Sequence, residues 1–302
     1  MSLKNGYLYV INTVLLFSTY EVVSKTLVDK IDPFKINFIR FLLGGIILFL
    51  FLLYKGDLKL EKKDLMAITA IGFINVVVSM NLMQLSLYMK GGQASLSAVI
   101  FSSNPIFVSI FAFFLDREKF NPVKIAGLVL GSLGIVVIFY EKLNIDSIDF
   151  RSPIFALLSA IFYALYTVLG RKQAVKVGSL KMNAYSFIAG SLLLLPILMI
   201  VNGPNVFEFD YSGTLQVIYL SVFVTGIAYL TYFKGLSIIG AGKGSMVFFV
   251  KPVLASIIAI VFLKEEPSLF LAAGTLLILV SIVLVLNSEK ILHKMNLRIG
   301  RQ

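Results

Sequence analysis

Long apolar runs separated by short polar clusters make up almost the whole chain. Ten such runs lie at 7–26, 34–54, 65–89, 92–115, 122–140, 152–175, 181–201, 213–238, 241–263 and 269–287. Each is close to the about 20 apolar residues that a helix needs to cross a bilayer. The runs lack the alternating pattern of membrane-barrel strands, and a helix satisfies its own backbone hydrogen bonds in lipid. The pattern therefore predicts an all-α membrane protein with ten transmembrane helices.

A signature of proline, glutamate and glycine occurs twice within this pattern. It consists of Pro105, Glu118 and Gly127, and it recurs 147 residues later as Pro252, Glu265 and Gly274. Each copy lies in a half of the chain with five predicted helices. Because five is odd, the second half must cross the membrane in the opposite direction to the first, as in an inverted repeat. We expect one five-helix repeat over 5–141, a second over 152–287, and a basic tail over 288–302.

The positive charges are distributed unevenly over the predicted loops. The chain carries 27 Lys and Arg against 16 Asp and Glu, a formal net charge of +11. Basic residues concentrate in the loops on the N-terminal side and in the tail, whereas the loop over 202–212 has none. Loops rich in Lys and Arg stay on the inner side of a membrane, so both termini are expected to be cytoplasmic, in a multi-pass protein of the cell membrane. Anionic lipid accounts for the same charges without nucleic acid.

Composition removes several kinds of site. Hydrophobic residues make up 58% of the chain, which has no cysteine and a single histidine, His293, in the tail. Disulfides, thiol catalysis, cysteine metal sites and histidine clusters are thereby excluded, and no cofactor is expected. A membrane-embedded enzyme acting on a lipid-linked substrate usually needs clustered carboxylates, histidines or a metal near one interface. The sequence shows no such cluster, so an enzyme stays a remote alternative, and so does a channel.

Two charged residues fall deep inside apolar runs. Glu21 lies 14 residues into the first run, about 21 Å along a helix, and Lys251 lies about 10 residues into the ninth run. A charge at such depth costs about 2.5–3.5 kcal/mol, so each is a candidate binding residue for a small polar metabolite. The alternative is a structural pair of Glu21 with Lys25 or Lys251. If Glu21 and Lys251 face one cavity, a zwitterion such as an amino acid matches them, and a buried carboxyl can also exchange protons.

Four neutral polar residues complete the candidate substrate site. Asn104 is the counterpart of Lys251 one repeat earlier in the chain. Asn81, Tyr163 and Tyr229 lie on polar faces of their predicted helices. We expect these residues to line the cavity, with the alternative that they join neighbouring helices.

Prolines and helix-end charges suggest where the halves move. Pro105 and Pro252 each remove a backbone hydrogen bond near the middle of a predicted helix, which makes them candidate hinges or static kinks. Glu118 and Glu265 follow the fourth and ninth runs at opposite faces, where they are expected to anchor helix ends or to contact a gate. Arg40, about 9 Å into the second run, is expected to hold helix ends or a gate carboxylate.

Several of these motifs match a known family. The strings NPIFVSIFAFFLDREKF and KPVLASIIAIVFLKEEPS, together with RFLL at residues 40–43, resemble the EamA-type families of the drug/metabolite transporter superfamily. The resemblance extends over about residues 5 to 287. It implies a ten-helix secondary transporter with a central cavity between inverted halves, commonly an exporter of amino acids or related metabolites, working by alternating access in a monomer or a homodimer.

A shorter resemblance supports an alternative substrate. The segment Tyr20–Leu27 is similar to the first helix of the small multidrug resistance proteins, whose membrane glutamate binds protons and cationic substrates. It implies that Glu21 is a proton or cation site. The alternative is therefore an organic-cation transporter, for drugs or choline-like compounds, centred on Glu21.

Gly127, Gly131 and Gly134 form a small-residue face for close helix packing.

Overall fold

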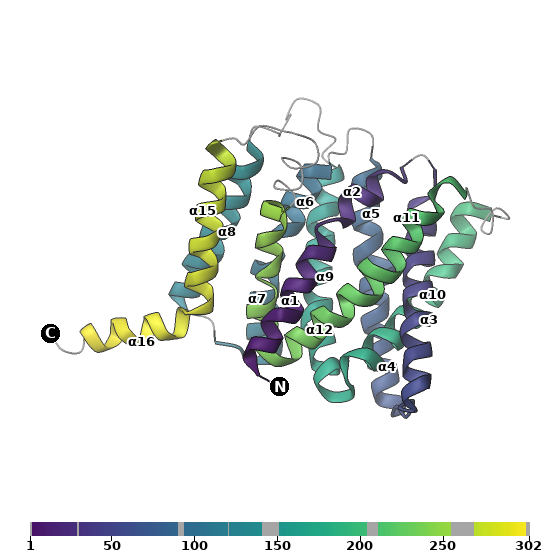
Figure 1. Ribbon diagram of the computed structural model, residues 1–302, viewed down its shortest axis with the longest axis horizontal. Helices are drawn as coiled ribbons and strands as arrows, with labels where there is room; N and C mark the ends of the chain where they lie inside the picture. Colours follow the sequence, from purple (N-terminus) through teal and green to yellow (C-terminus); the bar gives the residue numbers. More distant parts are fainter. Residues whose placement is uncertain are drawn as a thin grey trace.

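The computed structural model describes residues 2–28, 30–89, 94–119, 121–140, 151–203, 211–254 and 269–299. Within these ranges every regular element is a helix (Figure 1). The first half contains α1 (Leu3–Phe17), α2 (Tyr20–Lys25), α3 (Pro33–Lys55), α4 (Lys62–Gly72), the π-helix η1 (Phe73–Ser79), α5 (Met80–Tyr88), α6 (Ala94–Ser102), α7 (Asn104–Asp116) and α8 (Pro122–Phe139). The second half contains α9 (Arg151–Val177), α10 (Ser179–Asn202), the short η5 (Tyr211–Gly213), α11 (Thr214–Tyr219), the π-helix η6 (Leu220–Ile227), α12 (Ala228–Ile239), α13 (Ala241–Gly244), a helix over 247–254, α15 (Leu269–Leu286) and α16 (Ser288–Ile299).

Six of the described helices are long and apolar enough to cross a membrane. They cover Leu3–Lys25, Pro33–Lys55, Lys62–Tyr88, Arg151–Val177, Ser179–Asn202 and Thr214–Ile239. A seventh is added if the end of α15 and the start of α16, which meet at 70°, form one span. The prediction of ten spans is thus supported only in part. The run at 92–115 divides into α6 and α7, α8 is short, and the run at 241–263 extends beyond the described residues.

The internal repeat is visible in the helix bounds. α15 ends 147 residues after the end of α8, and η6 begins 147 residues after η1. A π-helix is rare and is often found at functional sites. Its recurrence at the same place in the third long helix of each half means that the repeat extends from a sequence signature to local backbone geometry.

The two halves run in opposite directions. A Cβ on Gly6, at the start of α1, would lie 2.6 Å from the Ile239 side chain at the end of α12. Glu118, just after α7, accepts the backbone N–H of Ala241, the residue that follows this end of α12 by two positions. Arg171, near the end of α9, pairs with Asp116 at the end of α7. The first helix of one half therefore begins at the face where the first helix of the other half ends, as Figure 1 shows.

The first span, Leu3–Lys25, is interrupted at Ser18 and Thr19, shortly before Glu21. Ser18 Oγ donates to the Val14 carbonyl at 2.6 Å, and Thr19 Oγ1 donates to the Leu16 carbonyl at 2.8 Å. Side chains that bond to the preceding turn compete with the backbone ladder and bend a helix. Glu21 consequently lies on a separate short helix, α2, which the sequence did not predict.

The glycine face of α8 is used inside the chain. It packs against α15 of the other half. A Cβ on Gly134 would lie only 2.8 Å from the Gly274 carbonyl oxygen of α15, so glycine permits this close approach. The predicted small-residue face thus joins the two halves, and it is not a free surface for a second copy of the chain.

Candidate functional site

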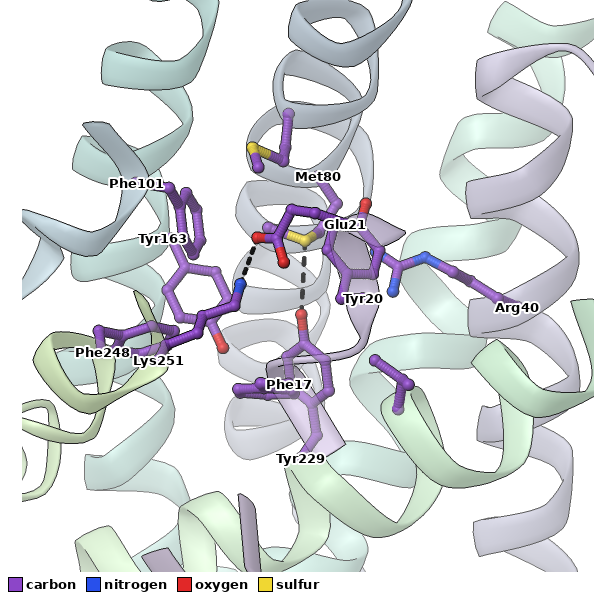
Figure 2. Close-up of a pocket in the computed structure, with 12 residues that line it drawn as sticks. Phe17, Tyr20, Glu21, Arg40, Met80, Phe101, Tyr163, Tyr229, Phe248 and Lys251 are labelled. Carbon is purple, nitrogen blue, oxygen red and sulfur yellow. Dashed lines mark hydrogen bonds and ion pairs between the residues drawn. The ribbon is translucent and has the colours of Figure 1, made fainter. Parts of the chain in front are cut away.

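A narrow cavity lies in the interior and receives side chains from both halves (Figure 2). Its volume is about 20 Å³, which is room for about one water molecule. A metabolite therefore fits only after helices move apart. The wall consists of Phe17, Tyr20, Glu21, Arg40, Met80, Met83, Phe101, Tyr163, Val224, Tyr229, Phe248 and Lys251.

Glu21 and Lys251 form an ion pair in the cavity wall. Lys251 Nζ donates to Glu21 Oε1, and the two residues are 4% and 6% exposed respectively. The pair links α2 of the first half to the 247–254 helix of the second half, and Figure 2 shows it between aromatic rings. Lys25, the other proposed partner of Glu21, donates to the Leu87 carbonyl at 3.1 Å. The two residues thus contact each other and also face the cavity.

Arg40 also lies in the cavity wall, a place that was not predicted from the sequence. It is 1% exposed, and its guanidinium lies over the rings of Tyr20 and Phe41, 4.8 and 4.3 Å from their centroids. Nε donates to Asn37 Oδ1 at 2.9 Å, and Nη1 donates to Thr225 Oγ1 at 3.4 Å. Nη2 has no hydrogen-bond partner.

The expected gate carboxylate for Arg40 is not found. No carboxylate of the described chain lies within 4.0 Å of its guanidinium nitrogens. The sequence contains one signal for its position, because Asn37 and Arg40 are three residues apart and therefore share a face of a mostly apolar helix. This polar pair marks the side of α3 that faces the interior.

Tyr163 and Tyr229 both lie in the cavity wall. Their ring centroids are 6.2 Å apart. The Tyr229 hydroxyl donates to Met80 Sδ at 3.5 Å, whereas the buried Tyr163 hydroxyl has no hydrogen-bond partner. Together with Phe17, Phe101, Phe248 and Tyr20 they make the wall largely aromatic.

Asn81 and Asn104 lie outside the cavity wall, in contacts between and within helices. Asn81 Nδ2 donates to the Val76 and Val77 carbonyls of η1, and its Oδ1 accepts from Asn37 Nδ2 at 2.7 Å. Asn104 Nδ2 donates to the Ala160 carbonyl at 2.8 Å, while its Oδ1 has no partner. In the structure both side chains thus join neighbouring helices, and their contact with substrate stays a prediction.

The predicted hinges lie beside interruptions of the helices. Pro105 is the second residue of α7, directly after the break at Ser103, whose Oγ donates to the Ile100 carbonyl at 2.6 Å. Pro252 lies within the 247–254 helix, which follows the turn at 245–246. Neither proline is in an uninterrupted helix of the predicted length.

Glu118 joins the two halves at the face where the chain begins. Its Oε1 accepts the backbone N–H of Ala241 at 3.0 Å and of Gly242 at 3.3 Å, and Oε2 lies 3.6 Å from Lys124 Nζ. Arg171 pairs with Asp116 at 2.5 Å on the same face. Glu265, the counterpart of Glu118 in the second repeat, lies outside the described residues.

In the described part of the chain, no three His, Cys, Asp or Glu side chains gather at a metal site.

The comparisons with known proteins agree with each other. An uncharacterized transporter of Clostridium kluyveri is 32% identical over 300 residues, which cover 95% of each chain. The uncharacterized transporter YoaV of Bacillus subtilis is 26% identical over 89% of this chain and 92% of its own. A WAT1-related protein of Arabidopsis thaliana, At3g02690, chloroplastic, is 25% identical over 89% of this chain and 66% of its own.

The fold and the repeat have matches of their own. A solved crystal structure superposes with a TM-score of 0.76 at 21% identity, covering 94% of this chain and 98% of that one, which shows the shared fold. The EamA-like transporter family matches residues 4–140 and 151–287, two segments with the same offset of 147 residues as the signature. The protein belongs to the EamA-like transporter family, within the drug/metabolite transporter superfamily.

Proposed function

We propose that the protein is a secondary-active transporter of the cell membrane that exports amino acids or related small polar metabolites by alternating access. One observation supports this most: the buried Glu21–Lys251 pair joins the two inverted halves at the cavity wall. The ammonium group of a substrate can replace Lys251 at Glu21, which couples substrate binding to separation of the halves.

The fold supplies the movement that this function needs. Two inverted halves of similar structure can exchange conformations, so that an inward-open state has an outward-open counterpart. Pro105 and Pro252 serve as hinges in this proposal, and the contact of Glu118 with Ala241 closes the side on which both termini lie in the cytoplasm. Alternating access then opens the cavity to one side at a time.

The chemistry of the wall favours a small polar substrate with an apolar part. Glu21 meets an ammonium group, a cationic residue meets a carboxylate, and aromatic rings and methionines surround the remaining atoms. Such a wall suits an amino acid. Protons are the proposed coupling ion, because a deep carboxyl such as Glu21 can exchange protons when the substrate or Lys251 leaves it.

Solid-supported membrane electrophysiology on proteoliposomes tests the function. Amino acids, organic anions and organic cations are added to wild type and to Lys251→Met. We expect currents for amino acids that saturate with concentration and that Lys251→Met removes. Counterflow of labelled substrate distinguishes a transporter from a channel, because a channel shows no counterflow.

The organic-cation alternative has an observation in its favour, the aromatic rings around Glu21, since such rings attract cations. Currents for cations alone, surviving Lys251→Met, would move the assignment to a cation transporter centred on Glu21. Glu21→Gln tests the coupling: transport by this variant is expected to lose its dependence on pH. Unchanged transport with unchanged pH dependence would remove Glu21 from the mechanism.

A further inference from the structure

The cavity contains a cation that the described protein does not neutralise. Among the described residues that line the wall, Glu21 is the one carboxylate, and Arg40 and Lys251 are the two cations. Lys251 is paired with Glu21, and Arg40 has no carboxylate partner. An uncompensated buried charge is costly in a membrane, so the wall has one positive charge that an anion would balance.

The contacts of Arg40 leave one of its guanidinium nitrogens available to a ligand. Two of its three guanidinium nitrogens are held, Nε by Asn37 and Nη1 by Thr225, while Nη2 has no partner. The ring contacts with Tyr20 and Phe41 fix the plane of the group. Figure 2 shows the guanidinium directed toward the cavity beside Tyr20.

A second group without a partner lies in the same wall. The Tyr163 hydroxyl is buried and makes no hydrogen bond. A buried polar group without a partner costs about 1–3 kcal/mol. The Tyr163 hydroxyl and Arg40 Nη2 are thus two separate donors in the wall, each of which could bind an acceptor that entered the cavity.

A chain of hydrogen bonds holds Arg40 in place. Asn81 is fixed by the carbonyls of η1, it accepts a hydrogen bond from Asn37, and Asn37 accepts one from Arg40 Nε. The orientation of the guanidinium therefore depends on the π-helix of the first half. Asn37 and Asn81 are positioning residues in this arrangement.

We propose that Arg40 is the residue that receives the anionic group of the substrate, a carboxylate, through Nη2. The proposal deepens the transport function and rests on it. One uncompensated positive charge matches a carboxylate better than a phosphate dianion, and guanidinium nitrogens make strong charge-assisted hydrogen bonds to carboxylate oxygens. The Glu21–Lys251 pair then stays intact until the ammonium group of a zwitterion competes for Glu21.

Thermal unfolding of the purified protein with four matched probes tests this assignment. The probes are L-phenylalanine, its amide, 3-phenylpropionate and phenethylamine, because six of the wall residues are aromatic. A compound that binds the folded state raises the unfolding midpoint. We expect L-phenylalanine and 3-phenylpropionate to raise it, and the two compounds without a carboxylate to leave it unchanged.

Variants of Arg40 and Asn37 complete the test. Arg40→Met is expected to lower the affinity for both carboxylates roughly 10- to 100-fold, and Arg40→Lys is expected to retain part of it. Asn37→Asp keeps Arg40 and gives it a carboxylate partner, so it should also abolish the stabilisation by carboxylates. Size-exclusion chromatography confirms folding, and Asn37→Asp keeps the test decisive if Arg40→Met does not fold.

The outcomes separate this proposal from the transport function. Wild type that no carboxylate stabilises, or an Arg40→Met protein stabilised as much as wild type, overturns the role of Arg40. If Arg40→Met leaves the flux of phenylalanine unchanged, the role of Arg40 is also overturned, but the transport function stands. Carboxylate binding that depends on Arg40, without flux of any probe, keeps the assignment of Arg40 and overturns transport of this substrate class.

Discussion

The two halves of the protein have similar backbone structures but different charged residues. The signature, the π-helices and the last helix of each half recur with an offset of 147 residues. The charged residues of the cavity wall do not. One repeat away, Glu21 corresponds to Val168, Arg40 to Phe187, and Lys251 to Asn104.

This difference separates two requirements of a transporter. Exchange between two conformations needs a symmetric scaffold, whereas one substrate molecule needs a single set of contacts. Duplicating Arg40 and Lys251 in both halves would bury further cations at about 2.5–3.5 kcal/mol each. Replacing a charged residue by its counterpart in the other half is therefore a direct way to test the comparison.

The largest effect is expected from Lys251→Asn, which gives the second half the residue of the first. It leaves the buried Glu21 carboxylate without its ion-pair partner, and removing one member of a buried pair costs about 3–5 kcal/mol. The double variant Glu21→Val/Lys251→Asn should recover most of this stability and still transport nothing. Unfolding of both proteins in the same detergent measures the difference, and a double variant as unstable as the single one would show that the pair does not behave as a unit.

A smaller loss is expected where the halves pack together. Gly134→Leu places a side chain between α8 and α15, where even a single Cβ would lie 2.8 Å from the Gly274 carbonyl oxygen. Overpacking of this kind costs about 1–3 kcal/mol. The thermal midpoint checks it, with Gly226→Ala as a control, because a Cβ on Gly226 would make only an ordinary contact of 3.5 Å with the Ser221 carbonyl oxygen. Equal midpoints for Gly134→Leu and wild type would contradict the close packing.

The contact of Glu118 with the other half should control access more than stability. Glu118→Gln weakens the bonds to the Ala241 and Gly242 N–H groups and the pair with Lys124. Loss of a cap costs about 0.5–2 kcal/mol. Because the chain has no cysteine, one cysteine introduced at Met83 in the cavity wall can report access. We expect thiol labelling from the side on which Glu118 lies to be several-fold faster in Glu118→Gln, and an unchanged rate would exclude a gating role.

The smallest effect is expected at the surface. Lys181 pairs with Asp57 at 2.7 Å, but the Asp57 side chain is 65% exposed. Exposed pairs contribute about 0–1 kcal/mol. Asp57→Asn should therefore lower the unfolding midpoint little, and 1 M salt should remove the difference from wild type. A loss as large as that of Lys251→Asn would mean that solvent does not screen this pair.

Much of the fold and part of the site could be predicted from the sequence, for identifiable reasons. Apolar runs predict helices because lipid leaves the backbone few choices, and Glu21 and Lys251 stand out because charge is rare at that depth. The break at Ser18 and Thr19 depends on side-chain bonds to carbonyls, and such residues also occur inside continuous helices. Whether the Arg40 side chain faces the cavity depends on the rotation of α3 about its axis, and packing against the second half sets that rotation.

Each half contains a π-helix, after which the following helical segment can rotate about its axis and shift along it. A π-turn holds one residue more than an α-turn, so its conversion to α-helix advances the following segment by one residue, a rotation of about 100° and a shift of about 1.5 Å. After η1 this motion would carry Met80 and Met83, and after η6 it would carry Tyr229, all of which line the cavity. A rotation of either helix would thus change the wall without any hinge at the membrane surface.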